Sequence, residues 1–127
     1  MVAYTKKGGA SFVATGTTGG AVTSITNYGN TLLNATSAEI FCLDPPVAGV
    51  FKRLVMTTSS TAATPIVRGS TGVTVTFNNA AATQLTFTAA SSDDAVIELL
   101  GISSTRWAIV SMYPVPSTAA GVAAGTS

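Results

Sequence analysis

Charge is what this chain has least of. Only 11 of its 127 residues are Asp, Glu, Lys or Arg, which is 9%, against roughly 25% in a typical soluble domain. The formal net charge is +1. A free monomer needs a well-solvated surface and a net charge away from zero to resist association. We therefore expect part of the surface to be covered, either by other copies of the chain or by a larger assembly.

Histidine is absent, and cysteine occurs once, at Cys42. The lack of histidine excludes a Ser-His-Asp triad and the usual zinc sites, and a single cysteine excludes an intrachain disulfide. Asp93, Asp94 and Glu98 could gather oxygen ligands for calcium, but the spacing of an EF-hand is absent, and a turn followed by a strand is our interpretation. The sequence thus predicts a protein that is not an enzyme, with no catalytic residue, metal site or cofactor.

Long apolar runs are also missing. No segment approaches the ~20 residues of a membrane-spanning helix, and the first residues lack the apolar core of a signal peptide. We therefore expect no membrane partner and assembly in the cytoplasm. Nucleic-acid binding depends on many phosphate contacts, and six scattered basic residues give little support for it. Lys52 and Arg53 are neighbours, so on a strand they point to opposite faces.

Alternation with a period of two dominates the middle of the chain. In 95–101, Val96, Glu98 and Leu100 share one face. In 105–112, the pattern groups Trp107, Ile109 and Ser111 on one face. Turn residues separate the alternating runs. The predicted strands are 21–26, 31–35, 38–43, 50–58, 65–69, 72–77, 83–89, 95–101 and 105–112. Strands this short at this spacing predict an all-β fold, a single compact β-sandwich or barrel-like domain.

The two ends of the chain differ from this body. Residues 1–20 are rich in Gly and Thr, and residues 114–127 are low in complexity and uncharged. Neither segment has enough apolar surface to offset the entropy of ordering its backbone. The sequence therefore predicts an N-terminal extended arm over 1–20, a β-rich body over 21–113 and a low-complexity C-terminal tail over 114–127.

Arg106-Trp107 is the sharpest local feature. Residues 96–111 predict a strand, a tight connection and a second strand, and Trp107, the only tryptophan, begins the second strand. We interpret Trp107 as a structural residue that closes one end of the core. An exposed platform for a sugar or a base is the alternative interpretation.

Two segments resemble small β-rich virion proteins of tailed bacteriophages. The run Glu-Leu-Leu-Gly-Ile-Ser-Ser-Thr-Arg-Trp (98–107) with its following apolar strand resembles their C-terminal hairpin. The run Leu-Asp-Pro-Pro-Val-Ala-Gly-Val-Phe-Lys-Arg-Leu-Val (43–55) resembles the same group, in which an Asp-Pro turn leads into a basic and apolar strand. The resemblance implies a non-enzymatic virion structural protein, assembled in the bacterial cytoplasm.

Among virion roles, the capsid decoration (cement) proteins fit the chain best. Such proteins are small, commonly form trimers and clamp the outside of the shell with flexible arms. The resemblance therefore implies two partners, the major capsid protein and further copies of this chain, and a location on the capsid exterior. The alternative is a receptor- or glycan-binding module of a phage tail fibre. The residues expected at partner contacts are Lys6, Lys7, Lys52, Arg53 and Arg68.

Overall fold

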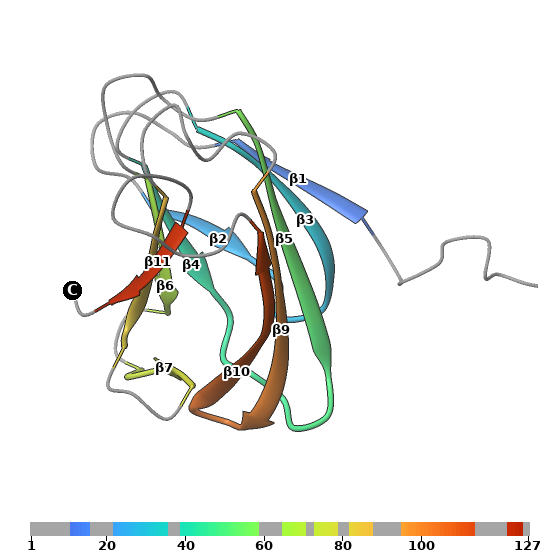
Figure 1. Ribbon diagram of the computed structural model, residues 1–127, viewed down its shortest axis with the longest axis vertical. Helices are drawn as coiled ribbons and strands as arrows, with labels where there is room; N and C mark the ends of the chain where they lie inside the picture. The colour runs from blue at the N-terminus through green and yellow to red at the C-terminus, as the bar shows by residue number, and fades with distance from the viewer. Residues whose placement is uncertain are drawn as a thin grey trace, which may run out of the picture.

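The protein is an all-β sandwich of two mixed sheets (Figure 1). The structure, a computed structural model, describes residues 11–15, 22–35, 39–58, 65–70, 73–78, 82–87, 95–113 and 122–125. In spatial order, the six-stranded sheet contains β1 (Ser11–Thr15), β3 (Gly29–Asn34), β5 (Phe51–Thr58), β9 (Ala95–Ser103), β10 (Arg106–Tyr113) and β7 (Thr76–Phe77). The five-stranded sheet contains β11 (Val122–Gly125), β8 (Gln84–Phe87), β6 (Ile66–Gly69), β4 (Ile40–Leu43) and β2 (Val22–Ile25).

The first six strands wind around the sandwich. Successive strands alternate between the sheets, so that β1, β3 and β5 are parallel neighbours in one sheet, and β2, β4 and β6 are parallel neighbours in the other. The turns around Gly29 and Asp44 therefore carry the chain across the core instead of closing hairpins. Gly29 has the positive φ of 71° that such a turn requires and that glycine adopts without strain.

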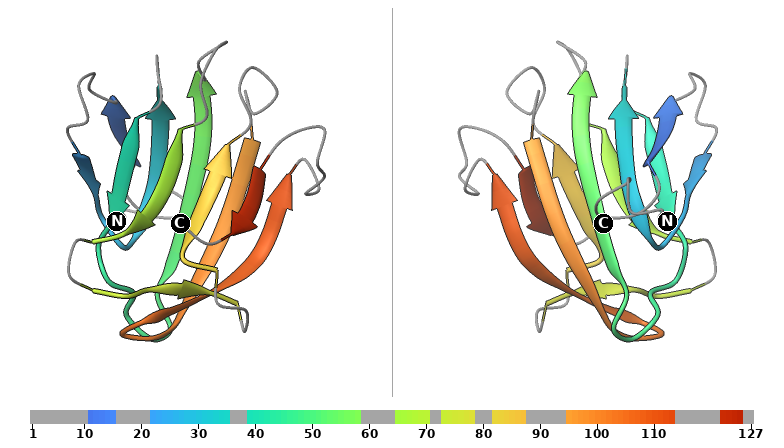
Figure 2. Two further views of the ribbon diagram at one scale, coloured as in Figure 1. Left: turned by 90° about the vertical axis from the view of Figure 1, so that its left-hand side faces the viewer. Right: turned by 90° about the vertical axis from the view of Figure 1, so that its right-hand side faces the viewer.

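The second half of the chain adds antiparallel strands to both sheets. Strand β9 pairs with β5 and then turns back into β10, which is the hairpin predicted from residues 96–111. Strands β8 and β11 extend the other sheet beyond β6. Figure 2 shows β3, β5 and β9 running side by side on one face of the molecule. The long strands β5, β9 and β10 thus form the centre of the larger sheet.

Each of the nine predicted strands overlaps a strand of the structure, β2 to β10. Two further strands lie inside the segments predicted as arms: β1 pairs with β3, and β11 pairs with β8. They were not expected, because residues 1–20 and 114–127 were each interpreted as a whole segment with too little apolar surface to become ordered. Residues 1–10, 16–21, 114–121 and 126–127 lie outside the described residues, so for these the extended arms remain a prediction.

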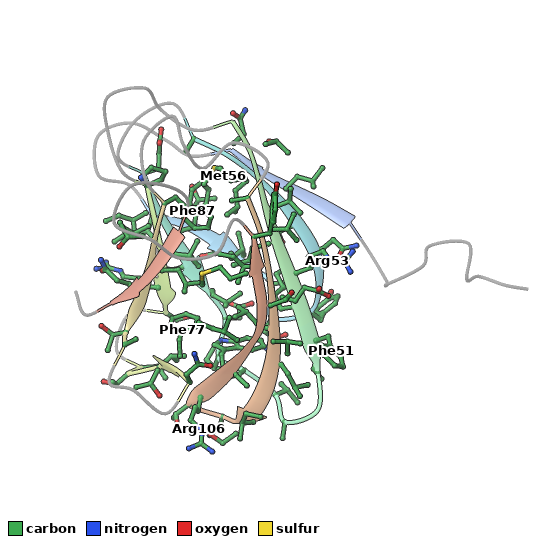
Figure 3. The ribbon with its side chains drawn as sticks, viewed as in Figure 1. Phe51, Arg53, Met56, Phe77, Phe87 and Arg106 are labelled. Carbon is green, nitrogen blue, oxygen red and sulfur yellow. The ribbon has the colours of Figure 1, made fainter. Side chains whose placement is uncertain are left out.

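The core lies between the sheets and is mainly apolar. Trp107, which the sequence places in the core, has 0% of its surface exposed. The largest other fully buried apolar side chains come from both sheets: Phe41, Leu43, Phe87, Leu85, Phe77, Leu33, Leu54, Met56, Ile97 and Leu99. Figure 3 shows Met56, Phe77 and Phe87 between the two layers. Two inward faces that interdigitate in this way are the packing expected of a sandwich.

Candidate interaction surface

The outer face of the six-stranded sheet carries the most exposed apolar side chains of the described residues. Along β5, Lys52, Leu54 and Met56 are buried, so the alternate residues Phe51 and Arg53 point away from the core. Figure 3 shows both of these side chains directed away from the five-stranded sheet. Because β9 and β3 are in register with β5, their alternate residues share this face.

A single polar row crosses the face at right angles to the strands. The register places Asn30 of β3, Arg53 of β5, Glu98 of β9 and Ser111 of β10 side by side. Arg53 Nη2 donates a hydrogen bond to Glu98 Oε2 at 3.2 Å, and Ser111 Oγ donates to Glu98 Oε1 at 2.9 Å. These hydrogen bonds, with the one from Ser111 having the larger effect, hold the pKa of Glu98 below its usual value. The carboxylate therefore remains ionised on an exposed surface.

Apolar side chains lie on both sides of this polar row. On one side, Phe51 pairs with Leu100, which pairs in turn with Ala108. On the other side, the neighbours in register are Leu32, Val55, Val96 and Tyr113. Phe51 is 59% exposed and Tyr113 is 68% exposed. Exposed apolar side chains gathered on one face, rather than scattered singly, indicate an interaction site.

A β-bulge in β10 places Ser111 in the polar row. The register between β10 and β9 shifts between Ile109 and Ser111, so Val110 is an extra residue on this strand and is 54% exposed. The alternation predicted from sequence, with Trp107, Ile109 and Ser111 on one face, is therefore wrong at Ser111. Ile109 packs against the core, whereas Ser111 lies outside next to Glu98.

Asn78 holds the bulged strand in place. Its φ of 62° lies in the left-handed region, which asparagine tolerates better than most residues. Its side-chain Oδ1 accepts a hydrogen bond from the backbone N–H of Ile109 at 2.7 Å. Its backbone N–H donates a hydrogen bond to the carbonyl of Trp107 at 2.6 Å. One asparagine thus occupies two backbone groups of β10 immediately before the bulge.

The face is hollowed beside the polar row. A shallow depression of about 310 Å³ is lined by Gly29, Asn30, Phe51, Lys52, Arg53 and Glu98. The depression lies where β3 and β5 begin, at Gly29 and Phe51. The depression is mainly apolar at its edge with Phe51 and charged at its edge with Arg53 and Glu98.

Lys52 lies on the inner side of the same strand. It is 1% exposed, and its Nζ donates hydrogen bonds to Thr26 Oγ1 at 3.2 Å, to the Tyr28 carbonyl at 3.0 Å and to Thr31 Oγ1. Burial lowers the pKa of Lys52 to about 8, against the opposing effect of Asp44. The lysine fastens the turn between β2 and β3 to β5 from within.

The residues expected to contact a partner lie in different parts of the domain. Lys52 is buried and bonded inside the domain, so the expectation that it meets a partner is corrected. Arg53, by contrast, is on the outer surface, as the opposite directions of adjacent strand residues require. Arg68 is half-buried on β6, and its neighbour Val67 is in the core, which places Arg68 on the outer face of the opposite sheet. Lys6 and Lys7 lie outside the described residues.

Neither the bulge nor the charged pair was identified from sequence as part of a site. Glu98 was weighed as a calcium ligand and interpreted as a strand residue facing solvent or a basic partner, but that partner was not identified, because Arg53 lies 45 residues away in the chain. In the described part of the chain, no three His, Cys, Asp or Glu side chains are grouped so that they could hold a metal ion. No helix within that part is long and apolar enough to cross a membrane.

Comparison of the chain with known protein families, with curated proteins and with solved structures finds no match. The arrangement described above offers a broad, weakly charged and mainly apolar surface, which suits contact with another protein surface better than chemistry on a small substrate.

Proposed function

We propose that this protein is a non-enzymatic virion structural protein, a capsid decoration (cement) protein that binds the outside of an assembled phage shell as a homo-oligomer. Its proposed partners are the major capsid protein and further copies of itself, and its proposed location is the capsid exterior. The observation that carries the proposal is the exposed apolar face of a sandwich in which only 9% of the residues are charged. The resemblance of residues 43–55 and 98–107 to phage virion proteins supports the proposal that the assembly is a phage capsid.

A decoration protein needs a rigid body and several surfaces that are covered in the virion. The sandwich supplies the rigid body, since β5 is paired on both sides along most of its length. A protein that binds only the assembled shell stabilises that shell by mass action. Several linked copies bind more tightly than one, because each bound copy raises the effective concentration of the next. The resemblance to decoration proteins implies three copies in the oligomer. The outer face of the six-stranded sheet favours two copies.

Co-sedimentation with capsids tests this proposal. The purified chain is mixed with expanded, emptied capsids assembled from the major capsid protein of the phage whose genome encodes the chain. We expect saturable binding and a higher temperature of capsid disruption, with no effect on unexpanded shells as the control. Absence of binding to the expanded shells would refute the decoration role. If the neighbouring gene encodes a tail fibre, and the chain binds host cells or glycans instead, the tail-fibre alternative is correct.

A further inference from the structure

We infer that two copies of this chain associate face to face through the outer surface of the six-stranded sheet, about a two-fold axis that runs parallel to the strands midway between β5 and β9. The second copy is thus the occupant of the apolar face. This inference deepens the self-association in the proposed function and rests on that part of it alone. A three-fold axis cannot place a surface against itself, whereas a two-fold axis does so by definition.

The charges on the face are arranged for this symmetry. Rotation about the axis exchanges the positions of β5 and β9 and preserves the level along the strands. Arg53 of one copy therefore lies over Glu98 of the other, and Glu98 lies over the other Arg53. Each copy already holds its own pair at 3.2 Å, so the two pairs form a square of alternating charge. The same rotation places the Asn30 amide over the Ser111 hydroxyl, so the whole polar row is complementary to itself.

The shapes of the two faces are also complementary when the copies are related by this two-fold axis. The axis places β10 of one copy over β3 of the other. Val110, the extra residue of the bulge, lies at a level between Glu98 and Leu99 of its own sheet, and the residues of β3 at that level are Asn30 and Gly29. These two residues line the depression of about 310 Å³. The protruding Val110 of each copy thus meets the hollow of the other, and this contact occurs twice.

The apolar rows also meet their equivalents. Phe51 lies over Leu100 of the second copy, and Val55 lies over Val96. The central strands are eight or nine residues long. At about 3.3 Å per residue and ~4.8 Å between strands, four strands present a flat area of about 500 Å². Side chains make the accessible area larger than the flat area, so the face approaches the ~800 Å² per partner of a standard interface.

Sedimentation equilibrium of the full chain at micromolar concentration is the first test. We expect a species of about 25 kDa, twice the 12.7 kDa of one chain. Val110→Lys should weaken the pair by roughly tenfold or more, because an ammonium group would be desolvated in a hollow where Glu98 is already paired with Arg53. The matched control is Val22→Lys, at a valine of the opposite sheet that is 41% exposed, and it should leave the mass unchanged. Both sites are exposed, and circular dichroism verifies that both variants fold.

A charge exchange tests the symmetry itself. Arg53→Glu alone places four carboxylates together in the pair, and Glu98→Arg alone places four guanidinium groups together, so each variant should be monomeric. In a mixture of the two variants, every acidic side chain faces a basic one, and the 25 kDa species should return as a heterodimer of about twice 12.7 kDa. A merely intrachain role of the Arg53–Glu98 pair would give no such rescue.

Three outcomes would overturn the inference: a monomeric wild-type chain, a trimer that Val110→Lys does not affect, or a mixture of the charge variants that stays monomeric. Capsid co-sedimentation is read separately. A chain that forms the pair but does not bind expanded shells would refute the decoration role and leave the pair intact. A monomeric chain that does bind shells would refute the pair and leave the decoration role intact.

Discussion

Replacement of Trp107 measures how much of the stability depends on one side chain. Trp107 is 0% exposed and lies at the start of β10, where the six-stranded sheet meets the short edge strand β7. Its indole Nε1 has no hydrogen-bond partner among the described residues. Two effects of opposite sign therefore act at this position: the ring contributes apolar burial and close packing, and the buried N–H carries a desolvation cost.

The two effects give different magnitudes for two substitutions. Trp107→Ala removes the ring and leaves a cavity, which typically costs about 3–5 kcal/mol of unfolding free energy. Trp107→Phe keeps most of the packing and removes the unsatisfied N–H, whose burial costs about 1–3 kcal/mol. We therefore expect Trp107→Phe to lower the free energy of unfolding by less than ~2 kcal/mol. Since small domains have about 5–15 kcal/mol in total, the alanine variant should unfold well below the wild-type midpoint.

Urea unfolding followed by far-ultraviolet circular dichroism is the suitable assay, because the substitutions remove the only tryptophan fluorophore. The m-value serves as a control, since an unchanged m-value shows that the midpoint reports stability alone. Equal midpoints for the wild type and Trp107→Ala would refute the core role. If the phenylalanine variant were as unstable as the alanine variant, the expectation that retained packing and the removed N–H limit the loss of stability would be refuted.

Three further predictions concern the backbone and Lys52. Gly101→Ala should lower the free energy of unfolding in urea by on the order of 2 kcal/mol. The new Cβ would lie 2.1 Å from the carbonyl oxygen of Val47. It would therefore disrupt the two backbone hydrogen bonds that Gly101 makes with Gly49 and Val50 of the same loop. A midpoint equal to that of the wild type would show that the loop moves aside freely. The pKa of Lys52 falls from 10.5 to about 8 on folding, so between these values the unfolded chain holds a proton that the folded chain has released. The free energy of unfolding should therefore rise over this pH range, and Lys52→Met should remove that part of the rise. Asn78→Ala should destabilise the fold by about 1–2 kcal/mol, because it loses the hydrogen bond to the Ile109 amide and strains a backbone with positive φ; Asn78→Gly, which relieves the strain, should cost less, and the opposite order would contradict this account.

The strands were predictable because alternation is a local signal. In 95–101, each buried residue alternates with a half-buried one, and the sequence pattern contains the same alternation. The order of the strands was not predictable. Turn residues such as Gly29 and Asp44 mark where the chain reverses, but they do not say whether it returns in the same sheet or crosses to the other. Strands β1 and β11 were missed because each is a run of only four or five residues inside a segment whose overall composition is poor in large apolar residues.

The interaction surface was only partly predictable for similar reasons. Adjacent residues of a strand point to opposite faces, so Lys52 and Arg53 were expected to separate. Which of them faces the core was undetermined, because Phe51 and Val55 are as apolar as Leu54 and Met56. The fold buries the lysine and exposes the phenylalanine. The bulge at Val110 could not be inferred, because it depends on Asn78, a residue more than 30 positions away in the chain.

The winding of the first six strands has a consequence for the order in which the protein folds. No two of these six strands that are adjacent in sequence pair with each other, so they form no hairpin among themselves that could close early. Among the described strands, the most local pairing is the β9–β10 hairpin, which follows all six of these strands in the chain. Folding is slow when contacts are distant in sequence, because loops must close before the contacts stabilise them. The sandwich should therefore stay open until β9 pairs with β5.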